Sequence, residues 1–231
     1  MKGIKFILVV IISGICIASC EKETSTQNGV LPINDTAACK SCIYQPWCDG
    51  SVFFYVDSTN DGSTVTVSNK TETLHILGDT LINGVLYSKS TNGQNDIFYH
   101  NCTNGVTTLI EYINSGISGS ALVPIKYTLL KSNEPVGAIW NDVNPGNGID
   151  NLYEYKIIAK SANRTVLGII YSDVIQVHQK ISINDSVLGV VIFSESDLYF
   201  AKGIGLIDKN IIDGTVNQNV YHRVLQSYIL P

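Results

Sequence analysis

Four cysteines are the most obvious chemistry-bearing residues of this chain: Cys39, Cys42, Cys48 and Cys102. Thiolates bind zinc, and Cys39-x-x-Cys42 has the spacing of half a zinc site. The sequence contains no second Cys-x-x-Cys pair and no His-x-x-x-His pair. An even number of cysteines instead favours two disulfides, provided that the chain is exported, as its N-terminus indicates. Three connectivities are open; we expect one bridge within residues 39–48 and one that ties this loop to a strand at Cys102.

A second candidate is the polar stretch 142–150, which resembles a calcium loop with oxygen ligands around a glycine-rich bend. The candidate ligands are Asp142, Asn144 and Asp150. The twelfth position of such a loop needs a bidentate Glu, but here it is Tyr153, and the sixth is Asn147 rather than Gly. We therefore interpret the stretch as a polar loop between a strand ending at Trp140 and one beginning near Leu152, and we predict no metal and no cofactor.

No pattern in the sequence predicts a catalytic residue. Residues 116–120, Gly-Ile-Ser-Gly-Ser, miss the last glycine of a nucleophile elbow. Glu195 and Asp197 would share one face of a strand, whereas a retaining glycosidase brings its carboxylates from opposite sides of the bond. The histidines form no pair at metal-binding spacing: His75, His100, His178 and His222. We interpret them as structural and predict that the protein is not an enzyme.

The first 20 residues have the organisation of a secretory signal. Two lysines precede an apolar run over residues 6–17, which is shorter than the ~20 apolar residues that span a membrane. Ile17-Ala18-Ser19-Cys20 resembles the lipobox of bacterial lipoproteins. The resemblance implies that residues 1–19 are removed as a signal peptide and that Cys20 is lipidated. Several acyl chains would then hold the protein firmly on a membrane.

Residues 20–37 are predicted to form a disordered tether, because the polar stretch 21–29 cannot bury apolar area. An acidic residue directly after the lipidated cysteine is similar to the export signals of Bacteroidota surface lipoproteins, although Lys22 separates the acids here. The expected location is the cell envelope, lipid-anchored on the outer membrane, with the periplasmic and surface faces both open.

Charge excludes one class of partner. The chain of 231 residues has 15 Lys and Arg against 20 Asp and Glu, and two of the lysines leave with the signal. The mature chain is therefore acidic and contains no basic run, which argues against nucleic acid. Apolar residues make up 45% and charged residues 15%, a composition that can fill a core.

The remaining chain alternates β-branched and aromatic segments with turn residues, and shows no amphipathic helix. The strongest hairpin signal is Asn83-Gly84. Strands are expected over residues 52–56, 64–67, 73–77, 81–82, 85–87, 96–100, 107–112, 153–158, 174–183, 187–193, 198–207 and 220–230. The last of these could seal a sheet edge. We predict an all-β or mostly β fold of antiparallel meander sheets, either as two related β halves or as one curved half-barrel.

The small-residue stretch 114–120 is the expected boundary between a Cys-containing N-terminal β region, residues 38–115, and a C-terminal antiparallel β region, residues 116–231. Two features favour an imperfect internal repeat. Residues 80–88 are similar to residues 165–172, and Tyr99 precedes Gly105 as Tyr199 precedes Gly205. The alternative is that unrelated hairpins use similar residues.

Gly203 and Gly205 alternate in segment 198–207, which we interpret as a strand with one bare face.

Three motifs resemble uncharacterised secreted lipoproteins of Bacteroidota. They are the run Cys39-x-x-Cys42-x-Tyr44-x-Pro46-Trp47-Cys48-Asp49-Gly50, the stretch from Arg164 to Val174, and the run YFAKGIGLI over residues 199–207. The folds suggested for those proteins are similar to the curved antiparallel sheets of LolA-type lipoprotein carriers. The resemblance implies an apolar concave face that holds a ligand, and it implies no known chemistry.

These observations predict a non-enzymatic envelope lipoprotein that acts as a binding, carrier or structural module. Its expected partners are the membrane, through the anchor, and an apolar ligand, a glycan or a protein. A carrier predicts a continuous apolar cavity on the order of a few hundred Å³. A surface protein that recognises a glycan or a protein predicts an exposed aromatic patch. A hydrolase, the least favoured class, would need titratable residues that converge in a cleft.

Overall fold

The computed structural model describes residues 42–60, 64–92, 96–114, 122–144, 149–185, 189–213 and 218–231. The predicted signal and tether, with Cys20 and Cys39, lie outside these ranges. Regular structure within them is entirely β-strand. In this part of the chain no helix has the length and apolar character needed to cross a membrane.

Twelve strands follow one another along the described ranges. They are β1 (Val52–Asn60), β2 (Val65–Ile82), β3 (Val85–Thr91), β4 (Ile97–Thr103), β5 (Val106–Asn114), β6 (Leu122–Lys131), β7 (Ile139–Asn144), β8 (Ile149–Val166), β9 (Ile169–Asp185), β10 (Gly189–Ala201), β11 (Gly205–Asp213) and β12 (Gln218–Ile229).

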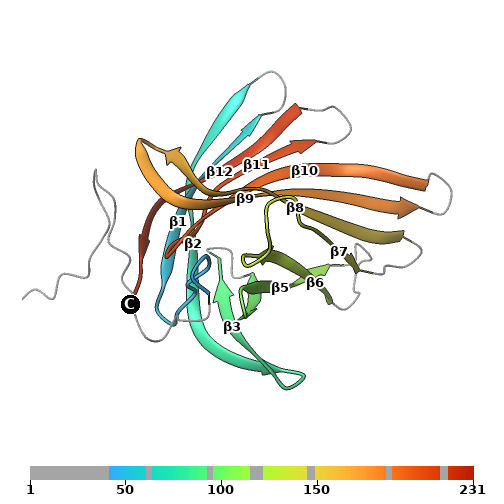
Figure 1. Ribbon diagram of the computed structural model, residues 1–231, viewed down its shortest axis with the longest axis horizontal. Helices are drawn as coiled ribbons and strands as arrows, with labels where there is room; N and C mark the ends of the chain where they lie inside the picture. Colours follow the sequence, from blue (N-terminus) through green and yellow to red (C-terminus); the bar gives the residue numbers. More distant parts are fainter. Residues whose placement is uncertain are drawn as a thin grey trace, which may run out of the picture.

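The strands form one antiparallel sheet in the order β6-β5-β4-β3-β2-β1-β12-β11-β10-β9-β8-β7. Neighbours along the chain are neighbours in the sheet, and β1 pairs with β12. The sheet curls until it is nearly closed into a barrel (Figure 1). The predicted all-β antiparallel meander is confirmed. The predicted role of the last strand is wrong, since β12 lies in the middle of the sheet and the edges are β6 and β7.

The two edge strands meet at a seam that side chains close. Trp140 of β7 donates its indole N–H to the Thr128 carbonyl of β6 at 2.8 Å. The Thr128 N–H donates to Asp142 Oδ2 at 2.5 Å, and the Lys126 N–H donates to Asn144 Oδ1 at 3.1 Å. The exposed main-chain groups of an edge strand are a template for pairing with other chains. Here the side chains of β7 satisfy those groups on β6.

Turn residues explain where the strands end. Asn83 and Gly84 have φ values of 51° and 78°, so the predicted hairpin is confirmed. The predicted strand over 198–207 is wrong, because β10 ends at Ala201 and β11 begins only at Gly205. Gly203 and Gly205 have φ values of 76° and 114°, a left-handed conformation that glycine adopts without steric cost. The two glycines therefore make a turn and do not alternate along a strand.

Strand length was the other feature that local patterns missed. Residues 65–82 form the single strand β2, where three short strands were predicted. A shift in the β2–β3 register between Ile76 and Asp79 accommodates the turn residue Gly78, whose φ is 101°. Such a bulge bends a strand without ending it.

The core lies in two clusters. One contains Tyr155, Ile157, Val177 and Phe200 of strands β8–β10, together with Tyr44, which precedes β1. The other surrounds Phe53, Ile207 and Leu225 of strands β1, β11 and β12, and the β8–β9 hairpin joins it through Val166 and Tyr171. Residues before β1 thus contribute directly to the packing of the distant half of the sheet.

Candidate functional site

A segment before β1 crosses one end of the barrel. We call residues 42–50 the strap. Cys42 forms a disulfide with Cys102 of β4, with the two Cα atoms 5.8 Å apart. The Gly50 N–H donates to the Ile76 carbonyl of β2 at 3.2 Å. The predicted bridge from the N-terminal loop to Cys102 is confirmed. Cys48 is also disulfide-bonded, whereas Cys39 lies outside the described residues.

The strap also reaches the opposite side of the sheet. The Tyr44 hydroxyl donates to Asp173 Oδ1 of β9 at 2.8 Å. Burial opposes the charged form of Asp173, but hydrogen bonds from Tyr44, Lys202 and Ser161 outweigh it and lower the pKa of this carboxyl. A Cβ atom at Gly205 would stand 3.3 Å from Gln45 Oε1 of the strap. Gly205 therefore serves both the turn and the close approach of the strap.

A cavity of about 500 Å³ lies between the strap and strands β2–β4. We call it the strap pocket. Its lining is mixed, with about equal polar and apolar surface, and includes Gln45, Trp47 and Asp49 of the strap, Asp79 of β2, Ser88 of β3 and His100 of β4. Among the lining residues there is no lysine or arginine. This cavity is therefore unlike the continuous apolar one that a lipid carrier predicts.

Three residues that line this pocket each carry a buried polar atom with no hydrogen-bond partner among the described residues: Gln45 Oε1, Trp47 Nε1 and His100 Nδ1. The exposed fraction is 3% for Gln45 and 6% for His100. An unsatisfied buried polar group costs about 1–3 kcal/mol, and most such groups in proteins are paired. All three belong to residues that line one cavity, so the unsatisfied groups are concentrated beside the strap pocket.

His100 is held neutral in this environment. Burial lowers its pKa well below the usual 6.5. Its ring contacts the indole of Trp47, with an angle of 36° between the ring planes. A neutral imidazole offers one donor and one acceptor. The indole N–H of Trp47 is a donor and the Gln45 oxygen is an acceptor, so the residues around the pocket include both kinds of hydrogen-bonding group.

Because His100 is buried and neutral, we expect stability to fall as the pH falls through 6.5. The unfolded histidine binds a proton near its usual pKa, whereas the folded one does so only at lower pH. The loss of unfolding free energy from about pH 7.5 to about pH 5.5 should be about 1.4 kcal/mol. Urea unfolding at the two pH values measures it. His100→Gln should remove this component, and His75→Gln, at an exposed position, should keep it. An unchanged pH dependence in His100→Gln contradicts the assignment.

A second cavity, of about 220 Å³, lies in the barrel interior and shares Gln45, Trp47 and His100 with the strap pocket. Leucines and Phe98 form part of its wall, and three charged residues form another part: Glu111, Lys209 and Arg223. Burial raises the pKa of Glu111 and lowers that of Lys209, and in each case the opposite charge of the partner counteracts the shift. The interior is therefore a mixed apolar and charge-paired chamber.

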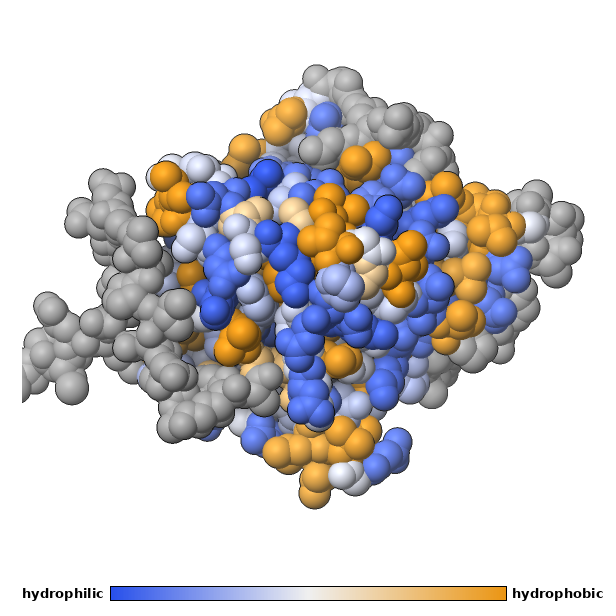
Figure 2. Space-filling view, in the orientation of Figure 1, coloured by the Kyte–Doolittle hydropathy of each residue, from blue (hydrophilic) through white to orange (hydrophobic). Residues whose placement is uncertain are grey.

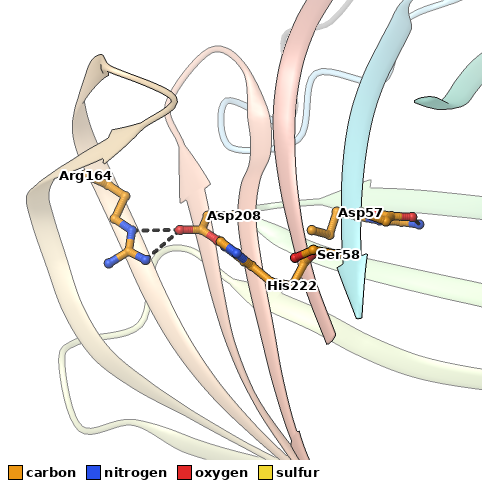
Figure 3. Close-up of polar contacts among 6 residues, drawn as sticks. Asp57, Ser58, Arg164, Asp208 and His222 are labelled. Carbon is orange, nitrogen blue, oxygen red and sulfur yellow. Dashed lines mark hydrogen bonds and ion pairs between the residues drawn. The ribbon is translucent and has the colours of Figure 1, made fainter. Parts of the chain in front are cut away.

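A further polar cluster lies on the face of strands β11, β12 and β1 that points away from the barrel interior, and it is shown in Figure 3. Asp208, which is 3% exposed, accepts hydrogen bonds from Arg164 Nε and Nη2 at 2.8 and 2.6 Å, and lies 2.8 Å from His222 Nε2. Ser58 lies beside His222, but its hydroxyl donates to the His222 carbonyl at 3.5 Å and not to the ring. An activated serine needs a ring nitrogen within hydrogen-bond reach. The cluster instead ties the β8–β9 hairpin to β11 and β12.

The remaining sequence candidates are spread over the sheet. Asp142 and Asn144 lie on β7 and hold the seam, and Asp150 lies on β8 opposite Asn184. The interpretation of 140–152 as one loop is wrong, because paired strands continue to Asn144 and resume at Ile149. Within the described ranges, no three His, Cys, Asp or Glu residues are arranged to hold a metal.

His178 lies beside two carboxylates on the outer face of the sheet. Its Nδ1 is 3.1 Å from Asp197 Oδ1, and its Nε2 is 3.9 Å from Glu195 Oε2. The three side chains are each about one-third exposed, as expected for a solvated rim. Residues 116–120 of the near-elbow motif lie outside the described ranges.

Sequence reasoning noted the strap motif but did not predict that its residues line a cavity. Trp47 and Asp49 belong to the cysteine-rich motif, and His100 was interpreted as structural only. One signal was available: His100 is two residues from Cys102, so a bridge from the strap to Cys102 brings the strap and His100 together.

Comparison with known proteins gives no family for the chain. No protein family model and no curated protein matches it. One similar solved structure is a protein of Parabacteroides distasonis ATCC 8503 described as a putative lipoprotein, with 12% identity and a TM-score of 0.49 over 82% of this chain and 99% of that one. Another is a protein of Bacteroides fragilis NCTC 9343 described as a putative exported protein with a YmcC-like fold, with 8% identity and a TM-score of 0.45 over 79% and 96%.

Proposed function

We propose that this chain is a lipid-anchored envelope protein that binds a small hydroxyl-bearing ligand, such as a glycan, in the strap pocket and does not transform it chemically. The observation that supports the proposal is that three residues lining one cavity, Gln45, Trp47 and His100, each have a buried polar atom without a hydrogen-bond partner among the described residues. The anchor and the envelope location rest on the signal and on Cys20 in the sequence.

The chemistry of the pocket favours a neutral or hydroxylated ligand over an anion. Its charged lining residues are the two acids Asp49 and Asp79, which would repel a carboxylate or phosphate. Carboxylates and amides accept and donate hydrogen bonds to hydroxyl groups, and an indole supplies an apolar ring beside them. This combination of groups supports the glycan alternative over the wholly apolar ligand that a LolA-like carrier would take.

The variant Trp47→Phe should change ligand binding and stability in opposite directions. It keeps a ring but removes the unpaired N–H, so binding should weaken roughly tenfold, as expected for one lost hydrogen bond. The ligand-free protein should become more stable by about 1 kcal/mol, because an unsatisfied buried donor disappears. Titration of the protein with N-acetylglucosamine, mannose, galactose and maltose, followed by NMR, measures binding, and urea unfolding measures stability.

Trp140→Phe is the matched control. The Trp140 indole N–H is already bonded to the Thr128 carbonyl at the seam, so its removal should destabilise the protein and leave saccharide binding unchanged. Binding that is equally weakened in both variants contradicts a specific role for Trp47. If no saccharide binds, and native mass spectrometry shows lipid retained from the host envelope, the glycan proposal fails and the carrier interpretation replaces it.

A further inference from the structure

The β2–β3 hairpin extends beyond its neighbours in the sheet. Pairing of β1 with β2 reaches only to His75, and pairing of β3 with β4 begins only at Ser88. Between these limits, β2 and β3 pair with each other from Asp79 to Ser88. The tip of the hairpin is therefore a two-stranded ribbon without backbone pairing to a third strand, although the Asn101 side chain of β4 donates to the Leu86 carbonyl at 2.7 Å. Figure 1 shows the hairpin projecting from the body at the bottom of the view.

This tip is apolar on both of its faces. Leu81 pairs with Leu86, and Ile82 pairs with Val85. Because cross-strand partners share a face and successive side chains of a strand point to opposite faces, Leu81 and Leu86 lie on one face and Ile82 and Val85 on the other. The exposed fractions are 70% for Leu81, 54% for Leu86 and 44% for Val85. Neither core cluster includes these residues. Figure 2 shows apolar surface gathered at the corresponding bottom end of the molecule.

The β8–β9 hairpin provides a contrast. Its tip exposes Leu167 and Ile170, each 60% exposed. On this hairpin, however, Val166 and Tyr171 are buried against the second core cluster. One side of the β8–β9 hairpin is thus buried up to Val166, next to the turn, whereas on the β2–β3 hairpin burial begins only at Tyr87, and Leu81, Val85 and Leu86 at the tip are exposed.

The chain enters the described fold at the base of the β2–β3 hairpin. Cys42, the first described residue, lines the strap pocket together with Gly78, Asp79 and Leu86. Between Cys20, the predicted lipidation site, and Cys42 the sequence has a segment that spans at most roughly 70 Å when fully extended. A membrane that holds the anchor is therefore within reach of the strap end, from which the apolar tip projects.

We propose that the tip of the β2–β3 hairpin, residues 81–86, enters the lipid bilayer that holds the chain's own anchor. The interfacial layer of a bilayer can take up a ribbon whose two faces are both apolar, because water and headgroups there satisfy the open backbone edges that hydrocarbon would leave unpaired. Asp79 and Ser88, which are hydrogen-bonded to each other at 3.0 Å, form a polar limit to the inserted part. The proposal places the strap pocket, at the base of the hairpin, close to the membrane surface.

The test uses the full chain with its acyl chains on Cys20, in vesicles of phosphatidylcholine and phosphatidylglycerol prepared with and without brominated acyl chains. Bromine quenches tryptophan fluorescence only at short range. Leu86→Trp places a new indole at the tip, and the matched control Leu167→Trp places one at the similarly exposed tip of the β8–β9 hairpin. Near-ultraviolet circular dichroism establishes that both variants keep the parent fold.

We expect brominated lipid to quench the added fluorescence of Leu86→Trp and to leave that of Leu167→Trp unchanged. Quenching of neither added indole, of both to the same extent, or of Leu167→Trp alone overturns the proposal. Leu86 also lines the strap pocket, so Leu81→Trp, at a tip position outside that lining, repeats the measurement and should be quenched as well. The Leu81→Trp outcome is independent of saccharide binding, so the membrane contact and the proposed function are tested separately.

Discussion

Replacement of both Cys42 and Cys102 with alanine should lower the free energy of unfolding by about 4 kcal/mol, the chain-entropy estimate for a bridge of this span. The two cysteines are 60 positions apart and hold the strap against β4. Without the bridge, the unfolded chain gains the freedom of a long open segment. The folded chain also loses one attachment of the strap, so ligand binding in the strap pocket should weaken together with stability.

Urea unfolding of the double variant and of the parent measures this effect. Tyr44→Phe is the comparison, since it removes another long-range attachment of the strap, the hydrogen bond to Asp173. That bond joins a half-buried carboxylate and should contribute about 1 kcal/mol, less than the disulfide. A loss below about 1 kcal/mol in the double cysteine variant would show that the remaining contacts hold the strap, against the estimate from loop closure.

Local patterns predicted the hairpins and the class of fold because their causes are local. Asn83-Gly84 supplies the left-handed residues that a two-residue hairpin loop requires. At the β8–β9 hairpin the same conformation is adopted by Leu167, with a φ of 48°, before Gly168. Leucine has no preference for that region, so its conformation there follows from the pairing of two long strands and is not visible in the sequence.

The proposed internal repeat remains a prediction, but the structure places its matched segments at a constant interval. The segments 80–88 and 165–172 form the turns of the β2–β3 and β8–β9 hairpins, six strands apart. Tyr99 lies on β4 and Tyr199 on β10, and Gly105 and Gly205 stand at the starts of β5 and β11. Both matches therefore have the same offset in a sheet of twelve described strands.

The strap pocket and the seam were beyond prediction because their partners are remote in sequence. Trp47 meets His100 only after the strap has crossed the barrel end, and Asp142 meets Thr128 only after the sheet has curled. A periodicity of two assigns a residue to a face of the sheet but does not say which strand lies across the barrel. The Asp142 carboxylate was for this reason interpreted as part of a loop.

The pairing of β1 with β12 contains the charge pair for which we expect the second large effect. Arg223 donates two hydrogen bonds to Asp57, each 2.9 Å long, and the exposed fractions of the two side chains are 23% and 17%. The guanidinium also lies over the ring of Tyr55, 5.4 Å from its centroid. Arg223→Met should destabilise the protein by about 3 kcal/mol, because it leaves the Asp57 carboxylate enclosed without its main partner.

Asp57→Leu combined with Arg223→Met should recover most of that loss, since apolar residues of similar volume can replace a buried ion pair at little cost. The coupling between the two sites, from the four urea unfolding curves, should be about 2 kcal/mol.

Lys202→Met provides the control: the Lys202 pair with Asp173 at 3.1 Å is more exposed and should contribute less than about 1 kcal/mol. Additive effects of the Asp57 and Arg223 variants would mean that Arg223 stabilises the β1–β12 pairing through its contact with Tyr55 and not through the carboxylate. The expected coupling follows from enclosure, because the same two charges on the outer face of the sheet would be screened by water.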